Sequence, residues 1–171
     1  MVCDNKSVGV IIEDNDGNVL MLKRARFPIG ISPVAGHVDD HGSPEQTATD
    51  EVQEELGLNV RPEDLLATEI QSRRVDNQCR RPGGDHHYWW VYKAKKFSGE
   101  LHPDKDETLG ARWYSPEELR GLANRTQVLE DGLYHEEKLT SPSGLPYFST
   151  QRNEPGLERV WLDFLTELGY L

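Results

Sequence analysis

The chain has 171 residues and a formal net charge of −11, and 29% of its residues are charged while 36% are hydrophobic. This composition is typical of a folded globular protein, and the acidic balance argues against general nucleic-acid binding and against binding to anionic membranes. No apolar run approaches the ~20 residues that a membrane span needs, so we expect a single domain over residues 1–171 and no membrane partner.

The start of the chain and its cysteines suggest a compartment. Residues 1–10 lack the basic and apolar regions of a signal peptide. Cys3 and Cys79 are too few for a disulfide framework. We therefore expect a protein of the reducing cytoplasm.

Three strands are expected ahead of the first helix, over residues 7–14, 19–25 and about 34–38. Asp16-Gly17 is a turn signal that makes the first two strands a hairpin. Proline and glycine punctuate residues 27–34, which we interpret as a loop.

The first helix has strong local signals at both ends. Ser43 is a good N-cap residue, Pro44 suits the first helical position, and Gln46 completes a capping box. Gly57 suits the C-terminal cap. A helix is therefore expected between Ser43 and Gly57.

The second half predicts five further segments. They are three strands over 65–75, 86–97 and 111–114, and two helices, one that starts at Ser115-Pro116 and one over about 155–169. An ordered loop or lid is expected in addition over 139–156. The last helix has one apolar stripe that should pack on the body of the protein. Strands and helices alternate without the even spacing of repeated βαβ units, so a mixed α/β fold is expected.

The first helix is unusually acidic. Residues 35–58 contain seven acidic side chains and no lysine or arginine. At 100° per residue, Glu51, Glu54 and Glu55 occupy an arc beside the apolar stripe. Like charges at this spacing destabilise a helix. A solvated acidic face is the simpler interpretation, but hard oxygen ligands in a cluster also suit Mg²⁺ or Mn²⁺, which would supply the missing positive charge.

This stretch resembles the Nudix box of hydrolases that act on nucleoside diphosphates linked to another group. The box pattern is G-x5-E-x7-R-E-U-x-E-E-x-G-U, where U is a bulky aliphatic residue. Seven positions match it at the right spacing, between Gly36 and Leu58: Gly36, Glu51, Val52, Glu54, Glu55, Gly57 and Leu58. Two positions depart from it, since Gly42 replaces a glutamate and Asp50 replaces an arginine.

The resemblance implies an α/β/α sandwich with a mixed β-sheet, and a metal-dependent hydrolase that cleaves a diphosphate linkage. It implies that Mg²⁺ or Mn²⁺ is held by Glu51, Glu54 and Glu55, with help from the carbonyl of Gly36. Water would attack phosphorus, and Glu51 and Glu54 would take part in catalysis. Glu107 is either the additional catalytic carboxylate that such domains often carry or an ordinary loop glutamate.

Several basic residues are candidates for substrate binding. Lys23, Arg24 and Arg26 end the second expected strand near the box loop, and one of them is expected to bind the phosphates of a small-molecule diphosphate substrate. The four arginines around residues 76–85 could form a clamp, but a solvated hairpin is the simpler interpretation. The sequence is also compatible with a homodimer.

The histidines and cysteines carry weaker signals. His37 in the box loop could ligate metal, although a structural hydrogen bond is the simpler interpretation. His86 and His87 are interpreted as strand residues. Cys79 has no evident base partner and is expected to be inert. Trp89 and Trp90 are expected in the core.

Two other functions remain open. Isopentenyl diphosphate isomerases share this kind of fold, but their Cys-Gly-His is Ala35-Gly36-His37 here, and no histidine precedes His37. A non-catalytic nucleotide-binding module is suggested by Gly42 and Asp50, and retention of the three helix glutamates argues against it.

Overall fold

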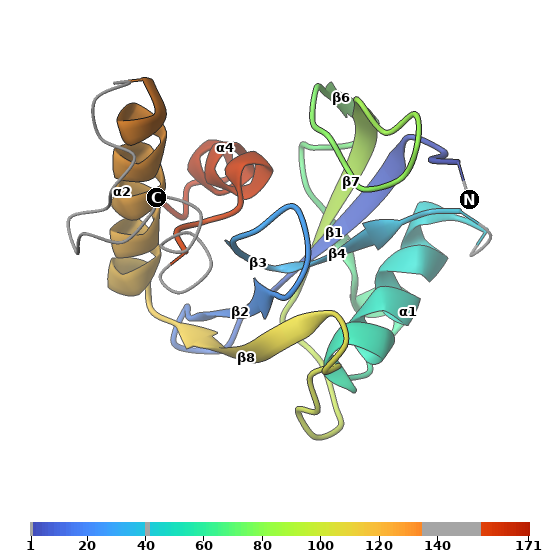
Figure 1. Cartoon of the computed structure of the whole chain (residues 1–171). Helices are drawn as coiled ribbons and strands as arrows, with labels where there is room; N and C mark the ends of the chain where they lie inside the picture. Colours follow the sequence, from blue (N-terminus) through green and yellow to red (C-terminus); the bar gives the residue numbers. More distant parts are fainter. Residues whose placement is uncertain (1, 40–41, 135–154) are drawn as a thin grey trace.

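The computed structural model describes residues 2–39, 42–134 and 155–171 (Figure 1). Its helices are α1 (Pro44–Leu56), α2 (Pro116–Tyr134), α4 (Arg159–Glu167) and the short 3₁₀ helix η1 (Pro62–Asp64). Its strands are β1 (Lys6–Ile12), β2 (Val19–Arg24), β3 (Ile31–Ser32), β4 (Val34–His37), β5 (Leu66–Ala67), β6 (Arg73–Val75), β7 (His87–Ala94) and β8 (Thr108–Tyr114).

The strands form two sheets. The larger sheet has the order β4-β1-β7-β5, and β6 also pairs with β7. Strands β1 and β7 run parallel, whereas the other pairs in this sheet are antiparallel, so the expected mixed sheet is confirmed. The smaller sheet has the order β3-β2-β8 and is antiparallel.

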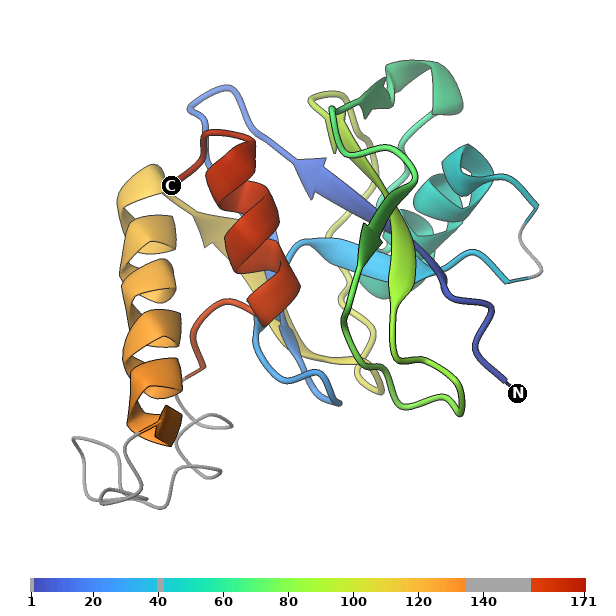
Figure 2. The same cartoon turned by 90° about the horizontal axis from the view of Figure 1, so that it is seen from above.

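Strand β1 separates two hydrophobic cores because its side chains alternate between the faces of the sheet. Val8, Val10 and Ile12 belong to the core that also contains the apolar stripe of α1. Ile11 belongs to the other core, with residues of α2 and α4. Helix α1 thus lies on one side of the strands, and α2 and α4 lie on the other (Figures 1 and 2). This arrangement confirms the α/β/α sandwich.

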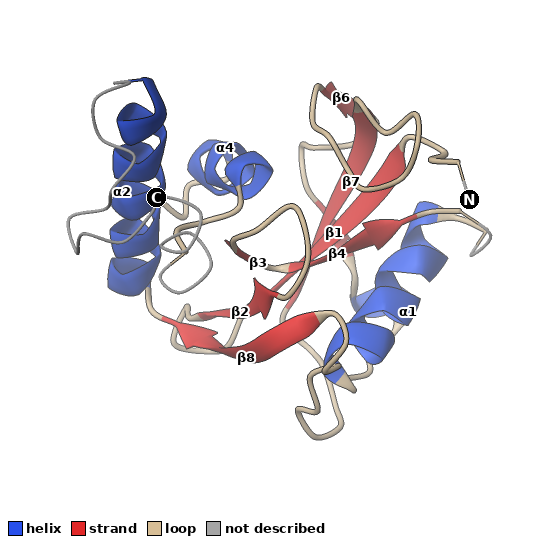
Figure 3. Cartoon of the chain, in the orientation of Figure 1, coloured by secondary structure: helices blue, strands red, loops and turns tan. Residues whose placement is uncertain are grey.

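The expected strand over residues 65–75 is two short strands, β5 and β6 (Figure 3). Between them, the Thr68 hydroxyl and the Gln71 amide both donate to the carbonyl of Val91, at 2.9 Å each. Ser72 has a positive φ of 52°. Side chains therefore replace the regular ladder here, a local irregularity that the apolar pattern did not reveal.

Two other expectations need correction. The segment 27–34, expected as a loop, contains the short strand β3, which pairs with β2 through Ile31 and Ser32. The first two strands, expected as a hairpin, lie in different sheets: the turn at Gly17 forms, but β1 pairs with β4 and β7, whereas β2 pairs with β3 and β8. Helix α2 begins at Ser115-Pro116 as expected and continues to Tyr134. Residues 139–154 of the expected loop or lid lie outside the described residues.

The last helix is α4, and its apolar stripe is buried as expected, with Trp161 and Leu165 inaccessible to solvent. The segment before it runs beside β3, since Ile31 N–H donates to the Gly156 carbonyl at 2.8 Å and Glu158 N–H donates to the Ile31 carbonyl at 2.9 Å. Among the described residues, no helix has both the length and the apolar character that a membrane crossing requires.

Candidate functional site

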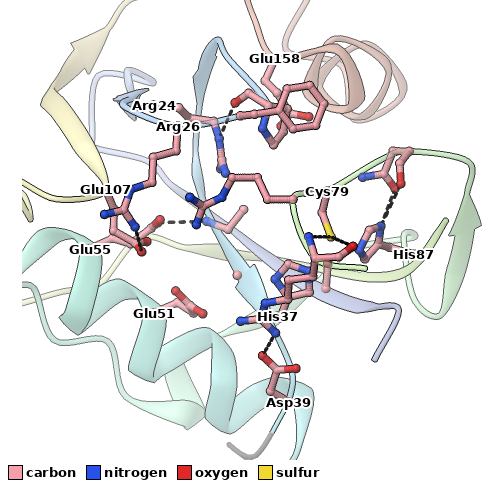
Figure 4. A pocket seen from close by; sticks show the side chains of 18 of the residues that line it. Arg24, Arg26, His37, Asp39, Glu51, Glu55, Cys79, His87, Glu107 and Glu158 are labelled. Carbon is pink, nitrogen blue, oxygen red and sulfur yellow. Dashed lines mark hydrogen bonds and ion pairs between the residues drawn. The ribbon is translucent and has the colours of Figure 1, made fainter. Parts of the chain in front are cut away.

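A pocket of about 650 Å³ opens beside α1 (Figure 4). Its walls include the end of β2, strand β4, helix α1, the loop over residues 77–81, the start of β7 and the loop that precedes β8. The buried Glu158 also lines it. The acidic helix and the candidate basic residues therefore meet around one cavity.

The caps of α1 fix where the helix begins and ends. The Ser43 hydroxyl accepts from Gln46 N–H at 3.2 Å, and Gly57 ends the helix with a φ of 70°. Between these caps, Glu51, Glu54 and Glu55 all line the pocket. The capping box is only half formed, because the Gln46 side chain donates to Asp50 at 2.7 Å.

Gly36 lies directly against the carboxylate of Glu51. A side chain at position 36 would displace that carboxylate from the place it occupies here, and glycine leaves this space open. The backbone of β4 and the acidic face of α1 are thus close together, although Glu51 lies fifteen residues after Gly36.

Glu55 is the buried member of the acidic group, with only 4% of its surface exposed. Its Oε2 accepts from Ala35 N–H at 3.2 Å. Burial, together with the negative charge of Glu51, raises the pKa of Glu55 to about 8. A buried carboxyl next to another carboxylate is a position that a cation would stabilise.

Glu107 and two of the three basic candidates also line the pocket. Arg26 forms an ion pair with Glu107, with 3.7 Å between Nη1 and Oε1. The Arg24 Nε donates to the Pro28 carbonyl at 2.8 Å, which fixes its direction. Lys23 is not among the lining residues. Figure 4 shows Arg24, Arg26 and Glu107 on the same side of the cavity as Glu55.

Glu158 is a pocket residue that sequence reasoning missed. It is 5% exposed, and burial raises its pKa to about 7, while the positive charge of Arg24 opposes this rise. It precedes α4 and lies far from the box in the sequence. No local pattern marks it, because its place depends on the pairing of residues 156–158 with β3.

The opposite wall contains histidine, cysteine and arginine side chains. Arg81 forms an ion pair with Asp39, whereas Arg73 pairs with Glu167 and Arg74 pairs with Asp76, away from the pocket. Arg80 lines the pocket and is exposed. The simple picture of a solvated hairpin therefore holds for part of this loop only.

His37 and His87 line this same wall. Burial, reinforced by the positive charge of Arg81, lowers the pKa of His37 to about 4, and burial also lowers the pKa of His87. The expected hydrogen bond of His37 is not seen at Nε2, which is buried and has no partner among the described residues. Cys79, expected to be inert, lies 3.6 Å from the sulfur of Cys3.

The two tryptophans pack as expected. Trp89 is buried in the core that contains α4, where its ring meets Trp161 edge-on, and it also borders the pocket. Trp90 packs against the core on the α1 side.

Neither departure from the box pattern lines the pocket. Gly42 is exposed and has a φ of 99°, a backbone conformation that a glutamate would adopt only with strain. Asp50 accepts the hydrogen bond from Gln46 on the flank of α1.

Comparison with known proteins finds similar sequences and similar folds. The family model described as the NUDIX domain matches residues 4–134. A curated NAD-capped RNA hydrolase, NudC of Stutzerimonas stutzeri (strain A1501), is 28% identical over 124 residues. That match covers 71% of this chain and 41% of the relative, so the chain spans less than half of that protein's length.

Solved structures show the same fold. The MutT NUDIX hydrolase of Burkholderia pseudomallei is 26% identical with a TM-score of 0.55, over 67% of this chain and 84% of that one. The MutT protein of Bacillus halodurans is 18% identical with a TM-score of 0.55, over 82% of this chain and 93% of that one. The latter likeness concerns the fold alone.

Proposed function

Because the chain belongs to the Nudix family, we propose that it is a divalent-metal-dependent pyrophosphohydrolase that cleaves a diphosphate linkage in a nucleoside diphosphate derivative or a related metabolite. The observation that carries this proposal is the convergence of Glu51, Glu54 and Glu55 with Gly36 on one pocket, which Arg24 and Arg26 also line.

The residues fit a hard divalent cation. Carboxylate and carbonyl oxygens are the ligands that Mg²⁺ and Mn²⁺ prefer. Glu55 is buried and its pKa is raised, so its ionised form gains from a nearby cation. Glu51, Glu54, Glu55 and the Gly36 carbonyl would hold the ion. When bound, it would neutralise phosphate oxygens and lower the pKa of a water molecule.

The other pocket residues have roles that follow from their charge. Arg24 and Arg26 would bind phosphate oxygens, because guanidinium groups match phosphates in charge and geometry. Glu54 or Glu107 would accept the proton of the attacking water. Arg26 pairs with Glu107 at 3.7 Å, a separation long enough for a substrate phosphate to compete for the arginine.

The alternatives are weaker. The isomerase lacks support because position 35 is alanine, whose N–H is bound to Glu55. A binding module would not need three ionisable carboxylates around one pocket. The named substrate of the Stutzerimonas stutzeri relative is NAD-capped RNA, and this substrate therefore belongs in any test.

The experiment is hydrolysis of a substrate panel by the purified chain. The panel contains nucleoside triphosphates, ADP-ribose, nucleotide sugars, dinucleoside polyphosphates, NAD-capped RNA and isopentenyl diphosphate. We expect release of a nucleoside monophosphate or of phosphate from at least one nucleotide, and no turnover when Mg²⁺ and Mn²⁺ are omitted. Isomerisation without hydrolysis, or binding without turnover at any metal concentration, would contradict the proposal.

A further inference from the structure

Four side chains outside the acidic cluster converge beside the pocket. Cys3, His37, Cys79 and His87 each place one ligand atom so that all four atoms lie within 4.8 Å of one another. They come from the N-terminal segment, β4, the loop over residues 77–84 and β7. Figure 4 shows Cys79 and His87 across the pocket from Glu55, with His37 between the two groups.

The spacing suits a tetrahedral ion. Zinc bonds of about 2.3 Å to sulfur and about 2.0 Å to nitrogen place neighbouring ligand atoms about 3.3–3.8 Å apart. The two sulfur atoms are 3.6 Å apart, and the sulfur of Cys3 is 3.2 Å from His87 Nε2. Two thiols and two imidazoles form the ligand set of a structural zinc site, and they differ in softness from the carboxylates of α1.

Backbone amides already face both sulfur atoms. Asn5 N–H donates to the sulfur of Cys3 at 3.4 Å, and Arg81 N–H donates to the sulfur of Cys79 at 3.3 Å. In both cases the donor is two residues after the cysteine. Such bonds stabilise thiolates, and outer hydrogen bonds of this kind orient metal ligands. Nearby, Gly84 leaves the space that the Cys79 sulfur occupies.

The histidines are also oriented for coordination. His87 Nδ1 lies 3.1 Å from the Asn77 carbonyl, to which it donates, so Nε2 carries the lone pair that faces Cys3. His37 Nε2 is buried without a partner among the described residues. A buried nitrogen left unsatisfied costs free energy, and an ion at the centre of the cluster would remove that cost.

From this convergence we infer that Cys3, His37, Cys79 and His87 bind one structural Zn²⁺, separate from the catalytic cation. Both cysteines lose their protons on binding, and the two thiolates balance the charge of the ion. The site joins the N-terminal segment and the loop over residues 77–84 to β4 and β7. It therefore holds one wall of the substrate pocket in place.

The first test measures zinc in the untagged protein, purified without a metal-affinity column and dialysed against Mg²⁺ buffer. Mass spectrometry of the metal should find about one Zn²⁺ per chain. Cys79→Ser and His87→Gln should each lose most of it. His86→Gln is the matched control, because His86 is the neighbouring histidine and bonds to Asp85 outside the cluster. Equal zinc in all the variants would mean an adventitious ion and would overturn the inference.

A second measurement covers the case in which a variant fails to fold. The parent protein is stripped of zinc, and Co²⁺ is added. We expect visible bands of a tetrahedral ion and a near-ultraviolet charge-transfer band from thiolate to cobalt. Absence of both bands in the folded parent would overturn the inference. A Cys3–Cys79 disulfide in the freshly purified protein, seen as a loss of both free thiols, would overturn it as well.

The zinc site and the proposed hydrolysis can fail independently. Glu54→Gln should retain zinc while it loses hydrolysis, because Glu54 lies outside the cluster. Omission of Mg²⁺, rather than addition of a chelator, tests hydrolysis without removing zinc. A protein that binds zinc but hydrolyses nothing would refute the proposed function alone, and the reverse result would refute the zinc site alone.

Discussion

On α1, Asp50 and Glu54 are one helical turn apart, yet only Glu54 lines the pocket. Both carboxylates belong to the same acidic stretch, so the composition of this stretch does not distinguish their roles. Their surroundings distinguish them: Asp50 accepts a hydrogen bond from Gln46, whereas Glu54 is exposed beside the buried Glu55. We therefore expect substitutions at these two positions to have opposite outcomes: a large loss of activity at Glu54 and little change at Asp50.

Replacement of Glu54 by glutamine should lower turnover by about 10²–10³-fold or more, as for other removals of a group that stabilises transition-state charge. Side-chain shape is kept, so the circular dichroism spectrum and the cooperativity of unfolding should not change. Steady-state kinetics at saturating Mg²⁺ measure the effect. Glu63→Gln is the control, since Glu63 is exposed and pairs with Arg61 outside the pocket. Turnover of Glu54→Gln close to that of this control would refute the assignment.

Replacement of Asp50 by asparagine should have little effect on activity, because the amide oxygen of the new side chain can still accept from Gln46 and position 50 lies outside the pocket lining. Stability should change by no more than about 0.5 kcal/mol, as is usual for surface positions. Rates measured at low and at saturating Mg²⁺ test this expectation. A large loss that added Mg²⁺ partly restores would instead place Asp50 among the groups that hold the metal through water.

At the scale of elements, the pairing of residues 156–158 with β3 decides the upper wall of the pocket. Two backbone hydrogen bonds join Ile31 to Gly156 and Glu158. A side chain at Gly30 would collide with the backbone of Glu158, so glycine permits this close approach. The short strand β3 thereby brings a buried carboxyl beside Arg24.

Glu158→Gln should stabilise the protein above pH 7 and have little effect near pH 4. The pKa of Glu158 is 4.5 in an unfolded chain and about 7 in the folded protein. Below pH 4.5 both states hold the proton. Between pH 4.5 and pH 7 the carboxyl group of Glu158 is ionised in the unfolded state but still protonated in the folded state, so the free energy of unfolding of the parent falls as the pH rises. Above pH 7 this loss of unfolding free energy amounts to about 3 kcal/mol.

Urea unfolding of the parent and of Glu158→Gln, at pH 4, 6 and 8 without added metal, measures this difference. The difference in unfolding free energy between Glu158→Gln and the parent should increase with pH. A constant gap would show that the glutamine acts through packing and not through the charge of residue 158.

At the scale of the whole molecule, the core that contains α2 and α4 depends on how closely α4 approaches β1. Gly9 lies in the middle of β1, and its Cα faces the far edge of the Trp161 ring. A methyl group at position 9 would overlap that ring. Trp161 is completely buried and packs edge-on against Phe164 and Trp89, so it has no room to move.

Gly9→Ala should therefore destabilise the fold by about 1–3 kcal/mol, the usual cost of overpacking. Trp161→Phe removes the ring atoms that would collide, so the alanine should cost much less in that background. A double-mutant cycle of unfolding free energies gives this coupling directly. Additive effects would show that Gly9 serves strand conformation rather than the packing of α4.

Local signals in the sequence were sufficient for the acidic helix and the outline of the fold. Ser43 and Gly57 set the ends of α1 through bonds to nearby backbone groups, and the apolar alternation of β1 reflects the two faces of its sheet. The box residues are all close in sequence. Such features depend on interactions between residues that are close in the sequence, so they can be predicted from the sequence alone.

Only the tertiary structure decided which distant residues share the pocket and its neighbourhood. Glu158 reaches Arg24 through the pairing with β3, and Cys3 meets Cys79 because the N-terminal segment crosses the loop over residues 77–84. The break between β5 and β6 likewise depends on side chains that bond to β7. These contacts are between residues that are far apart in the sequence. No periodic pattern encodes them, because the packing of the sheets and helices sets the distances.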